Sequence, residues 1–371
     1  MANKSICMLL TNEFDPDVRV YKEAEYLVRK GFLVDILCWH RDINKDYPEK
    51  EIMNGIRVVR FKIPSVVGSG YRQIVPYLKY IAAVRRYCKS QKYDYYHCND
   101  LDGAIVWQFI KHKKSQMIFD MHEYYEDVGN SSEFKRRLMR KATIWFIKKS
   151  RFALYENDLY LRENYKSIRN KLLELKNYPD SKYIKDIGKT ESEVFRIGYF
   201  GGVRSQIPEF KTLFEAVKGM NDVKVDIYGD GPDLVTLRKI ACDYNNVMVH
   251  GSFNGITELN TLYANADILY AGYRPWSDTR ECAEVVKFFE AIVTGTPIIM
   301  TECYTSMASR INDNCWGITC DTLSIEQVRD AVMKLKTDRA FWSSCRENEL
   351  ASANQYDWNT EVLVLDRAYG L

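Results

Sequence analysis

The sequence lacks the patterns that mark several specialised classes of protein. Its ten cysteines include no Cys-x-x-Cys pair, the pattern typical of zinc ribbons and dithiol redox motifs. No apolar run approaches the roughly 18 residues that a membrane-spanning helix requires. The first apolar stretch, at residues 6–10, is too short for a signal peptide. We therefore expect a buried strand there and a cytoplasmic protein with reduced cysteines.

A large net charge is also missing, because 53 Lys and Arg nearly balance 50 Asp and Glu. The two halves nevertheless differ. Residues 1–190 carry 36 Lys and Arg against 24 Asp and Glu, whereas residues 191–371 carry 17 against 26. A basic half joined to an acidic half predicts two domains with different partners, and the basic half suits an anionic surface or substrate.

Short apolar runs of strand length alternate with segments of helical periodicity in the first half. Residues 5–11 and 33–39 are expected to be buried strands on either side of a helix at 19–30, which makes a βαβ unit. Further strands are expected at 57–61, 95–98, 117–121 and 152–155, and further helices at 71–91, 104–111 and 134–149.

A second series of such units follows a weakly periodic segment at 178–194, which we interpret as a linker. Its expected strands are at 196–200, 223–228, 247–250, 268–271 and 297–300, and its expected helices at 210–217, 234–244, 258–264, 285–294, 325–335 and 360–369. We predict an α/β protein of two Rossmann-like, doubly wound domains that face each other across a cleft. The domains are placed at 1–180 and 195–354, and a C-terminal helix at 355–371 could pack back on the first.

Glycines follow two expected strands of the second half, in Gly201-Gly202 and in Gly229-Asp230-Gly231-Pro232. In open parallel sheets, ligands bind at the carboxyl ends of the strands, and glycine lets a phosphate approach the backbone closely. Neither loop matches Gly-x-Gly-x-x-Gly or a P-loop. The glycines alone therefore name no ligand, and ordinary turns explain them equally well.

Charged residues of the second half are candidates for holding a diphosphate. Arg204 follows the first glycine pair and could place a fixed cation over such a group, although a solvated surface arginine has the same signature. Lys287 and Glu290 are three positions apart in an expected helix, so they share one face. A simple salt bridge is the plainer interpretation of that spacing.

Polar residues also follow strands of the first half. Asp15 lies in the loop after the first strand, Asp100 and Asp102 follow the strand at 95–98, and His122 follows the strand at 117–121. The cleft is expected at these strand ends. His122 is one of five histidines, but a lone histidine is more often structural than catalytic, so its position leaves both roles open.

Seven segments, in order along the chain, carry a resemblance to a known family. They are Phe14-Asp15-Pro16-Asp17-Val18-Arg19-Val20 with Glu23-Ala24, Asn99-Asp100-Leu101-Asp102, Phe119-Asp120-Met121-His122-Glu123, Asn177-Tyr178-Pro179-Asp180, Ile197-Gly198-Tyr199-Phe200-Gly201-Gly202, Ile227-Tyr228-Gly229-Asp230-Gly231-Pro232, and Lys287-Phe288-Phe289-Glu290-Ala291 with Gly295-Thr296-Pro297. This succession resembles the retaining glycosyltransferases of family 4, which have the GT-B fold, in the branch with a Lys-x-x-Glu pattern.

The resemblance implies an acceptor site in the first domain, with Asp15, Arg19, Asp100 and Asp102, and a UDP- or GDP-linked sugar donor in the second. The implied donor-binding residues are Gly201, Gly202, Arg204, Gly229, Lys287 and Glu290. The implied catalytic residues are His122, Arg204 and Lys287. Glu290 would hold the donor ribose hydroxyls, the two cations would neutralise the departing diphosphate, and His122 would lie near the transferred sugar. The leaving phosphate would help to deprotonate the acceptor, with neither metal nor cofactor.

Two positions depart from the family pattern. Many members carry a glutamate eight residues before the one matching Glu290, where this chain has Cys282, with Glu281 and Glu284 beside it. The Lys-x-x-Glu branch also lacks that glutamate. The lysine that usually follows the arginine by about six residues is missing, and Lys211 is the nearest substitute. A non-catalytic GT-B subunit that supports a partner transferase is therefore an alternative.

Residues 134–151 combine basic and apolar side chains on one expected helix. The basic ones are Lys135, Arg136, Arg137, Arg140, Lys141, Lys148, Lys149 and Arg151. Such a helix suits an anionic membrane, so we expect peripheral association with the inner face of the plasma membrane, near a lipid-linked acceptor. A buried face with a solvated basic side explains the pattern as well. No nucleic-acid-binding module accompanies the charge, so no nucleic-acid partner is expected.

The sequence thus predicts a retaining glycosyltransferase that moves a sugar from a nucleotide-sugar to a saccharide or lipid-linked saccharide in surface polysaccharide biosynthesis. A sugar-nucleotide epimerase on the same fold is a further alternative. Another is a GT-A transferase in which Asp100-Leu101-Asp102 binds a metal, although that fold has one nucleotide-binding domain whereas this chain predicts two.

Overall fold

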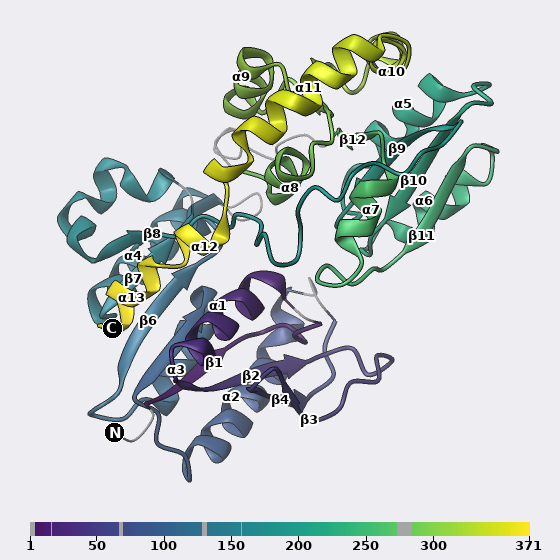
Figure 1. The fold of residues 1–371 in the computed structure, drawn as a ribbon. Coiled ribbons are helices and arrows are strands. Elements are labelled where there is room, and N and C mark those ends of the chain that lie inside the picture. Colours follow the sequence, from purple (N-terminus) through teal and green to yellow (C-terminus); the bar gives the residue numbers. More distant parts are fainter. Residues whose placement is uncertain (1–3, 16, 67–69, 128–131, 157, 273–283) are drawn as a thin grey trace. The chain divides into compact units, whose positions relative to one another are not determined.

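A computed structural model of the chain describes residues 4–15, 17–66, 70–127, 132–156, 158–272 and 284–371. The chain forms two compact units (Figure 1). Unit 1 comprises Met1–Lys176 together with Glu361–Leu371, and unit 2 comprises Asn177–Thr360.

Unit 1 is built on a sheet whose described strands lie in the order β3-β4-β2-β1-β5-β6-β7-β8. They are β1 (Ser5–Leu9), β2 (Leu33–His40), β3 (Lys50–Met53), β4 (Ile56–Lys62), β5 (Tyr95–Asn99), β6 (Gln116–Met121), β7 (Phe152–Tyr155) and β8 (Leu172–Glu174). The pairs are parallel except for β3 with β4 at one edge. The chain winds outward in both directions from β1 and β5, which makes that pair the topological switch point.

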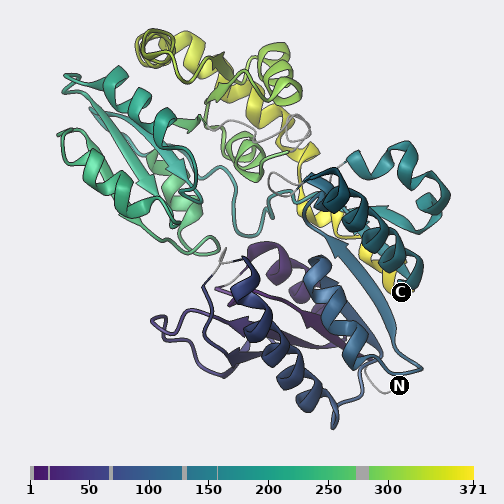
Figure 2. The same ribbon diagram turned by 180° about the vertical axis from the view of Figure 1, so that it is seen from behind.

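Helices cover both faces of this sheet (Figures 1 and 2). They are α1 (Val18–Arg29), α2 (Ile74–Cys88), α3 (Asp100–Ile110), α4 (Glu133–Lys149) and α13 (Val364–Tyr369). On the face covered by α2, α3 and α4, the core includes Tyr96, Cys98 and Phe119. Because side chains alternate along a strand, His97 and Asp120 lie on the opposite face, which α1 and α13 cover.

The start of unit 1 shows how the sequence sets these elements. Ile6 to Leu9 of β1 are completely buried, as expected for a strand covered on both faces. Asp17 precedes α1, and its carboxylate accepts a hydrogen bond from the Val20 N–H at 3.3 Å, which is an N-cap. Gly31, with φ of +88°, ends the helix.

Unit 2 is built on a second sheet, whose described strands are all parallel and lie in the order β11-β10-β9-β12-β13-β14. They are β9 (Phe195–Phe200), β10 (Val223–Tyr228), β11 (Val247–Gly251), β12 (Ile268–Ala271), β13 (Ile298–Thr301) and β14 (Gly317–Cys320). The helices are α5 (Ile207–Val217), α6 (Leu234–Ala241), α7 (Leu259–Asn265), α8 (Val286–Thr294), α9 (Thr305–Asn314), α10 (Ile325–Thr337), α11 (Arg339–Ser352) and α12 (Trp358–Glu361).

Numbered from β9, this order is 3-2-1-4-5-6, the order of a Rossmann fold with its switch point between β9 and β12. Two α/β units with parallel Rossmann-like sheets confirm the predicted fold class. The alternative of a GT-A transferase with one nucleotide-binding domain is wrong.

The C-terminal segment belongs to unit 1 although unit 2 precedes it in sequence. Tyr95 Oη donates to the Tyr369 carbonyl at 2.8 Å, and Tyr26 Oη donates to Asp366 Oδ1 at 2.6 Å. Leu365 and Tyr369 are completely buried. The core of unit 1 is therefore completed by residues that follow the whole of unit 2.

Candidate active site

Two glycine loops meet at the carboxyl edge of the sheet in unit 2. Gly201 follows β9, and its N–H donates to the Tyr228 carbonyl at 2.9 Å, while Gly229 follows β10. A Cβ on Gly229, whose φ is +158°, would lie 1.8 Å from the Gly201 carbonyl oxygen. No side chain fits at this approach of two backbones, so the glycine at 229 is a steric requirement.

Lys287 extends over this turn. Its Nζ lies 4.0 Å from the centroid of the Tyr199 ring, and a Cβ on Gly201 would lie 2.5 Å from the same Nζ. The side chain is half-buried. The ammonium group is thus held beside a turn that carries no side chain, where an anionic group can approach closely.

Glu290 lies one turn further along α8, on the same face as Lys287. Tyr263 Oη donates to Glu290 Oε2 at 3.0 Å, which orients the carboxylate. Gly202 and Arg204 are exposed in the loop after β9. Contacts therefore join Gly201, Gly229 and Lys287, and the helix places Glu290 beside them.

The structure describes only some of the residues at the positions that depart from the family pattern. Cys282 and Glu281 lie outside the described residues, as does Pro16 of the first motif. Glu284 pairs with Arg310, with Nη1 3.0 Å from Oε1. Lys211, the nearest substitute for the missing lysine, is exposed on α5.

At the switch point of unit 1, Asp100 and His122 are in contact. Asp100 adopts the left-handed backbone conformation with φ of +60°, and its Oδ1 accepts hydrogen bonds from the His122 N–H at 3.2 Å and from Tyr125 Oη at 2.7 Å. Asp15 and Asp102 are exposed after β1 and β5. Of the four residues predicted at these strand ends, the structure brings Asp100 and His122 into direct contact.

His122 lies between two carboxylates. Its Nε2 is 2.8 Å from Asp120 Oδ2, and its Nδ1 is 3.7 Å from Asp100 Oδ2. Burial opposes the charged form, but the two carboxylates outweigh it and raise the pKa of His122 to about 10. At neutral pH the ring is therefore an imidazolium, which donates hydrogen bonds and cannot act as a base.

Arg19 is a buried cation that contacts Asp120, the carboxylate partner of His122. Its guanidinium contacts Asp120 (Nη2–Oδ1, 2.8 Å), Glu156 (Nη1–Oε2, 3.1 Å) and Glu23 (Nε–Oε1, 3.2 Å). Burial would raise the pKa of Asp120, but Arg19 and His122 prevail and hold it well below its usual range. Arg19 thus keeps Asp120 ionised, and its direct contact with an acceptor stays a prediction.

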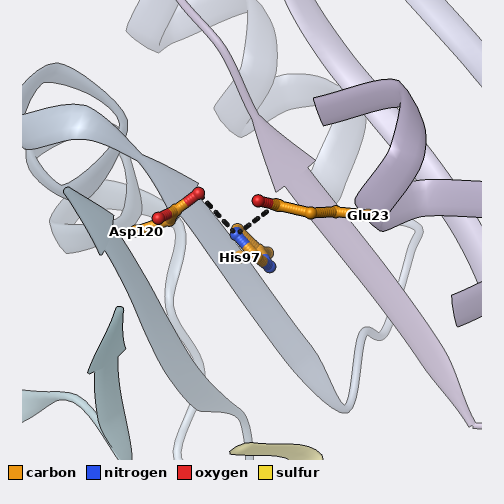
Figure 3. A group of neighbouring side chains, drawn as sticks. All are labelled: Glu23, His97 and Asp120. Atoms are coloured by element: carbon orange, nitrogen blue, oxygen red, sulfur yellow. Dashed lines mark ion pairs between the residues drawn. The ribbon is translucent and has the colours of Figure 1, made fainter. Parts of the chain in front are cut away.

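Sequence reasoning missed His97 and assigned no site role to Glu23. His97 lies between Glu23 and Asp120, with Nε2 3.2 Å from Glu23 Oε2 and 3.6 Å from Asp120 Oδ2 (Figure 3). All three side chains are completely buried. Burial and Asp120 raise the pKa of Glu23 well above its usual range, and burial lowers the pKa of His97, so burial disfavours the charged form of each. The available sequence signal was a histidine in a buried strand, which is weak.

By spacing, Glu23, His97 and Asp120 could hold a metal ion, since one ligand atom from each lies within 4.8 Å of the others. Arg19 Nε, however, already lies 3.2 Å from Glu23 and 3.3 Å from Asp120. A positive charge thus already lies against both carboxyl groups of the cluster. We therefore assign no metal to the cluster.

A cavity of about 540 Å³ opens beside the loop after β1 in unit 1. It is lined by Glu13, Arg41, Asp42, Ile43, Asn44, Pro64, Ser65 and Val66. Arg41 Nε lies 4.0 Å from Glu13 Oε1, and both side chains are partly buried. A mixed polar and apolar lining suits a ligand that has hydroxyl groups and an apolar part.

The solvent face of α4 is apolar as well as basic. Phe134, Leu138 and Trp145 are 76%, 55% and 40% exposed. Spacings of four and seven residues place them in one stripe, and exposed Lys135 and Lys141 lie among them. None of the described helices has the length and apolar character needed to cross a bilayer.

Two family models match the chain in succession. Residues 16–155, in unit 1, match a glycosyl transferase 4-like domain. Residues 194–338, in unit 2, match glycosyl transferases group 1. Among curated proteins, a probable sucrose-phosphate synthase 2 from Oryza sativa subsp. japonica is 34% identical over 74 residues, and this match spans 20% of the chain but 8% of the rice protein.

Solved structures share the fold over nearly the whole chain. A sucrose-phosphate synthase from Thermosynechococcus elongatus has a TM-score of 0.75 at 15% identity, covering 99% of this chain and 98% of that one. The Anabaena protein HepE, solved in complex with UDP and glucose, has a TM-score of 0.68 at 13% identity, covering 98% and 99%. Identities this low establish the fold alone.

The fold and the two successive domains define a glycosyltransferase of the GT-B class, as the sequence predicts. Within that class, the chain belongs to the glycosyltransferases that join a 4-like N-terminal domain to a group 1 C-terminal domain.

Proposed function

We propose that this chain is a retaining glycosyltransferase acting on a UDP- or GDP-linked sugar donor. The observation that carries the proposal is Lys287 Nζ beside the Gly201 turn, with Glu290 one turn further along the same helix. A cation at a turn without a side chain suits a diphosphate. A carboxylate oriented by Tyr263 suits the two hydroxyls of a ribose.

In the proposed reaction, the bond between the anomeric carbon and the donor phosphate oxygen breaks, and its electron pair goes to the diphosphate. Lys287 and Arg204 stabilise that growing charge. The acceptor hydroxyl oxygen bonds to the anomeric carbon on the face that the phosphate leaves, and its proton passes to the departing phosphate. His122 is already protonated, so its proposed role is to donate a hydrogen bond to the transferred sugar.

The proposed acceptor is a saccharide or lipid-linked saccharide in surface polysaccharide biosynthesis. Asp15, Asp100 and Asp102 offer carboxylates to its hydroxyl groups, and the cavity beside Arg41 offers room for a further sugar or an apolar part. The exposed stripe of α4 would rest on the inner face of the plasma membrane, where lipid-linked acceptors reside.

Thermal unfolding with UDP-, GDP-, ADP- and dTDP-sugars tests the donor site. A ligand at 100 times its dissociation constant stabilises by about 2.7 kcal/mol, which shifts the midpoint by a few degrees. One nucleotide class should stabilise the wild type and fail to stabilise Glu290→Ala. Glu347→Ala, which removes an exposed carboxylate from α11, should behave like the wild type.

The outcomes separate the alternatives. Stabilisation by none of the nucleotides would favour a non-catalytic GT-B subunit. Stabilisation followed by conversion of the donor into another nucleotide-sugar, with no free nucleotide released, would favour an epimerase. Released nucleotide diphosphate with the sugar transferred or hydrolysed is the result expected of a transferase.

A further inference from the structure

We propose that Tyr369, His97 and Glu23 are positioning residues for His122, acting through Asp120. This inference rests on the proposed function for its kinetic consequence, but the contacts that carry it lie within unit 1. It gives the C-terminal segment a part in organising a site that α1, β5 and β6 otherwise build.

The contacts form a continuous buried path. Tyr369 Oη lies 2.8 Å from His97 Nδ1, and both side chains are completely buried. On the other side of the ring, His97 Nε2 faces Glu23 and Asp120 (Figure 3). Asp120 then contacts His122 at 2.8 Å. The path starts on α13 and ends at His122, to which the proposed function gives a hydrogen bond to the transferred sugar.

The proton on His97 is fixed by this arrangement. A neutral imidazole has one donor and one acceptor nitrogen, and the partner of one nitrogen decides the state of the other. Nε2 faces the carboxyl oxygens of Glu23 at 3.2 Å and of Asp120 at 3.6 Å, and a proton on Nε2 leaves Nδ1 to accept a hydrogen bond from Tyr369 Oη. The tyrosine hydroxyl therefore favours the tautomer whose Nε2–H points towards these two carboxyl groups.

The charge state of His122 depends on the charged and titratable groups that face it. Asp120 and Asp100 favour its charged form, whereas Arg19 opposes it, and Glu23 and His97 lie behind Asp120. If His97 turned its Nε2 lone pair towards Asp120, the lone pair would repel the carboxylate, which would move away from the ring. The hydrogen bond that orients His122 would then lengthen or break.

Two matched variants test the inference in the full chain. Tyr369→Phe removes the hydroxyl that bonds His97. Tyr165→Phe removes a comparable hydroxyl, since Tyr165 is also completely buried in unit 1 and donates to Glu126 Oε1 at 2.7 Å. The readouts are the titration of His122 by NMR with 13C-labelled histidine, and donor hydrolysis resolved into kcat and KM.

We expect Tyr369→Phe to lower the titration midpoint of His122 and to reduce kcat about tenfold with little change in KM, because partners one layer behind a working group commonly have effects of this size. Tyr165→Phe should leave both unchanged. Equal His122 titrations in the two variants would overturn the inference. So would a shift of the His97 signal on adding Zn²⁺, since that would identify a metal site instead.

The NMR and kinetic readouts are independent, which separates failure of this inference from failure of the proposed function. A wild type that turns over no nucleotide-sugar, with Glu290→Ala indistinguishable from it in the unfolding assay, would count against the proposed function. The NMR titration would still decide whether Tyr369 acts on His122.

Discussion

Asp120 is contacted by three side chains of unit 1, those of Arg19, His97 and His122. Its sequence context, a strand that runs into Met121-His122, indicated a strand end but not this network. Arg19 and His97 come from α1 and β5, and no local spacing relates them to Asp120, whereas His122 follows it by two residues. The residue pattern could therefore mark His122 as a candidate, whereas its charge state required the fold.

Asp120→Asn should expose this coupling through pH. The pKa of His122 is about 10 in the folded chain, against about 6.5 for an unperturbed histidine. A pKa raised by folding contributes stability that is fully present below about pH 6.5 and is lost as the pH rises through about 10. The variant should lose this pH dependence and titrate His122 nearer pH 6.5.

Chemical denaturation of the full chain across pH 6 to 10 measures the pH dependence of stability, and the His122 NMR signal measures its titration. Because a buried ion pair is broken, we also expect a loss of about 3–5 kcal/mol at neutral pH. Asp100→Asn is the control, with a smaller shift, since Asp100 lies 3.7 Å away and its side chain is 36% exposed. An unchanged pH dependence in Asp120→Asn would contradict the assigned charge state.

Gly229→Ala tests whether stability and nucleotide binding require the close approach of the Gly201 and Gly229 backbones in unit 2. The new Cβ would meet the Gly201 carbonyl, so the loops must separate, at a cost of about 1–3 kcal/mol and with loss of nucleotide-dependent stabilisation. Gly219→Ala is the control, because its φ of +80° is also left-handed but no atom lies within 4 Å. Thermal unfolding should show a larger loss at 229, and equal losses would show that backbone conformation alone matters.

At the scale of elements, apolar runs predicted the strands that are buried on both faces of a sheet. The strand expected at 223–228 is β10, and the helix expected at 134–149 is α4 to within a residue. β3 was not predicted, because Lys50–Met53 forms an edge with alternating exposure and no apolar run. β8 is three residues long, too short for a periodic pattern.

The helix α4 illustrates the limit of such patterns. Periodicity showed that it is amphipathic, but Phe134, Leu138 and Trp145 are exposed while Thr143, Phe146 and Ile147 are buried. Which apolar residues face the core depends on where the helix packs on the sheet. The sequence alone left a membrane face and an ordinary core face open; the structure shows a core face and an exposed stripe, and contact of that stripe with a membrane stays a proposal.

Replacing both Phe134 and Trp145 by Ser should weaken binding to phosphatidylglycerol vesicles at least about tenfold, because each exposed ring can bury apolar area in the bilayer. Co-sedimentation at low salt measures this, and added salt should weaken the wild type as well. Phe109→Ser removes an exposed aromatic residue from α3 and should bind normally. Equal binding by all three proteins would argue against α4 as the membrane face.

At the scale of the whole molecule, unit 1 depends on residues from both ends of the chain. Sequence patterns gave two series of βαβ units, but the contact between His97 and Tyr369 joins positions 272 residues apart. Nothing in the local sequence of Val364–Tyr369 distinguishes a helix that completes unit 1 from one that extends unit 2. Packing against Tyr95 and Tyr26 decides it.

Leu365→Ala should destabilise unit 1 selectively. Leu365 is completely buried in α13, so its truncation is expected to cost about 2–5 kcal/mol. Leu335→Ala, at a completely buried position of α10, should place a similar cost on unit 2. Hydrogen exchange should accelerate in β1 and β5 for the first variant and in β13 and β14 for the second. Acceleration in unit 2 from Leu365→Ala would contradict the assignment of the C-terminal segment.

The interrupted sequence of unit 1 also sets an order for biosynthesis. A ribosome makes β1 to β8 first, then all of unit 2, and Glu361–Leu371 only afterwards. Unit 2 has its complete sequence available before unit 1 does, although domains commonly fold in the order of their synthesis. Until Glu361–Leu371 has been made, the nascent N-terminal unit lacks the contacts that α13 makes with Tyr95 and His97, so the packing of α13 is a late step of its folding.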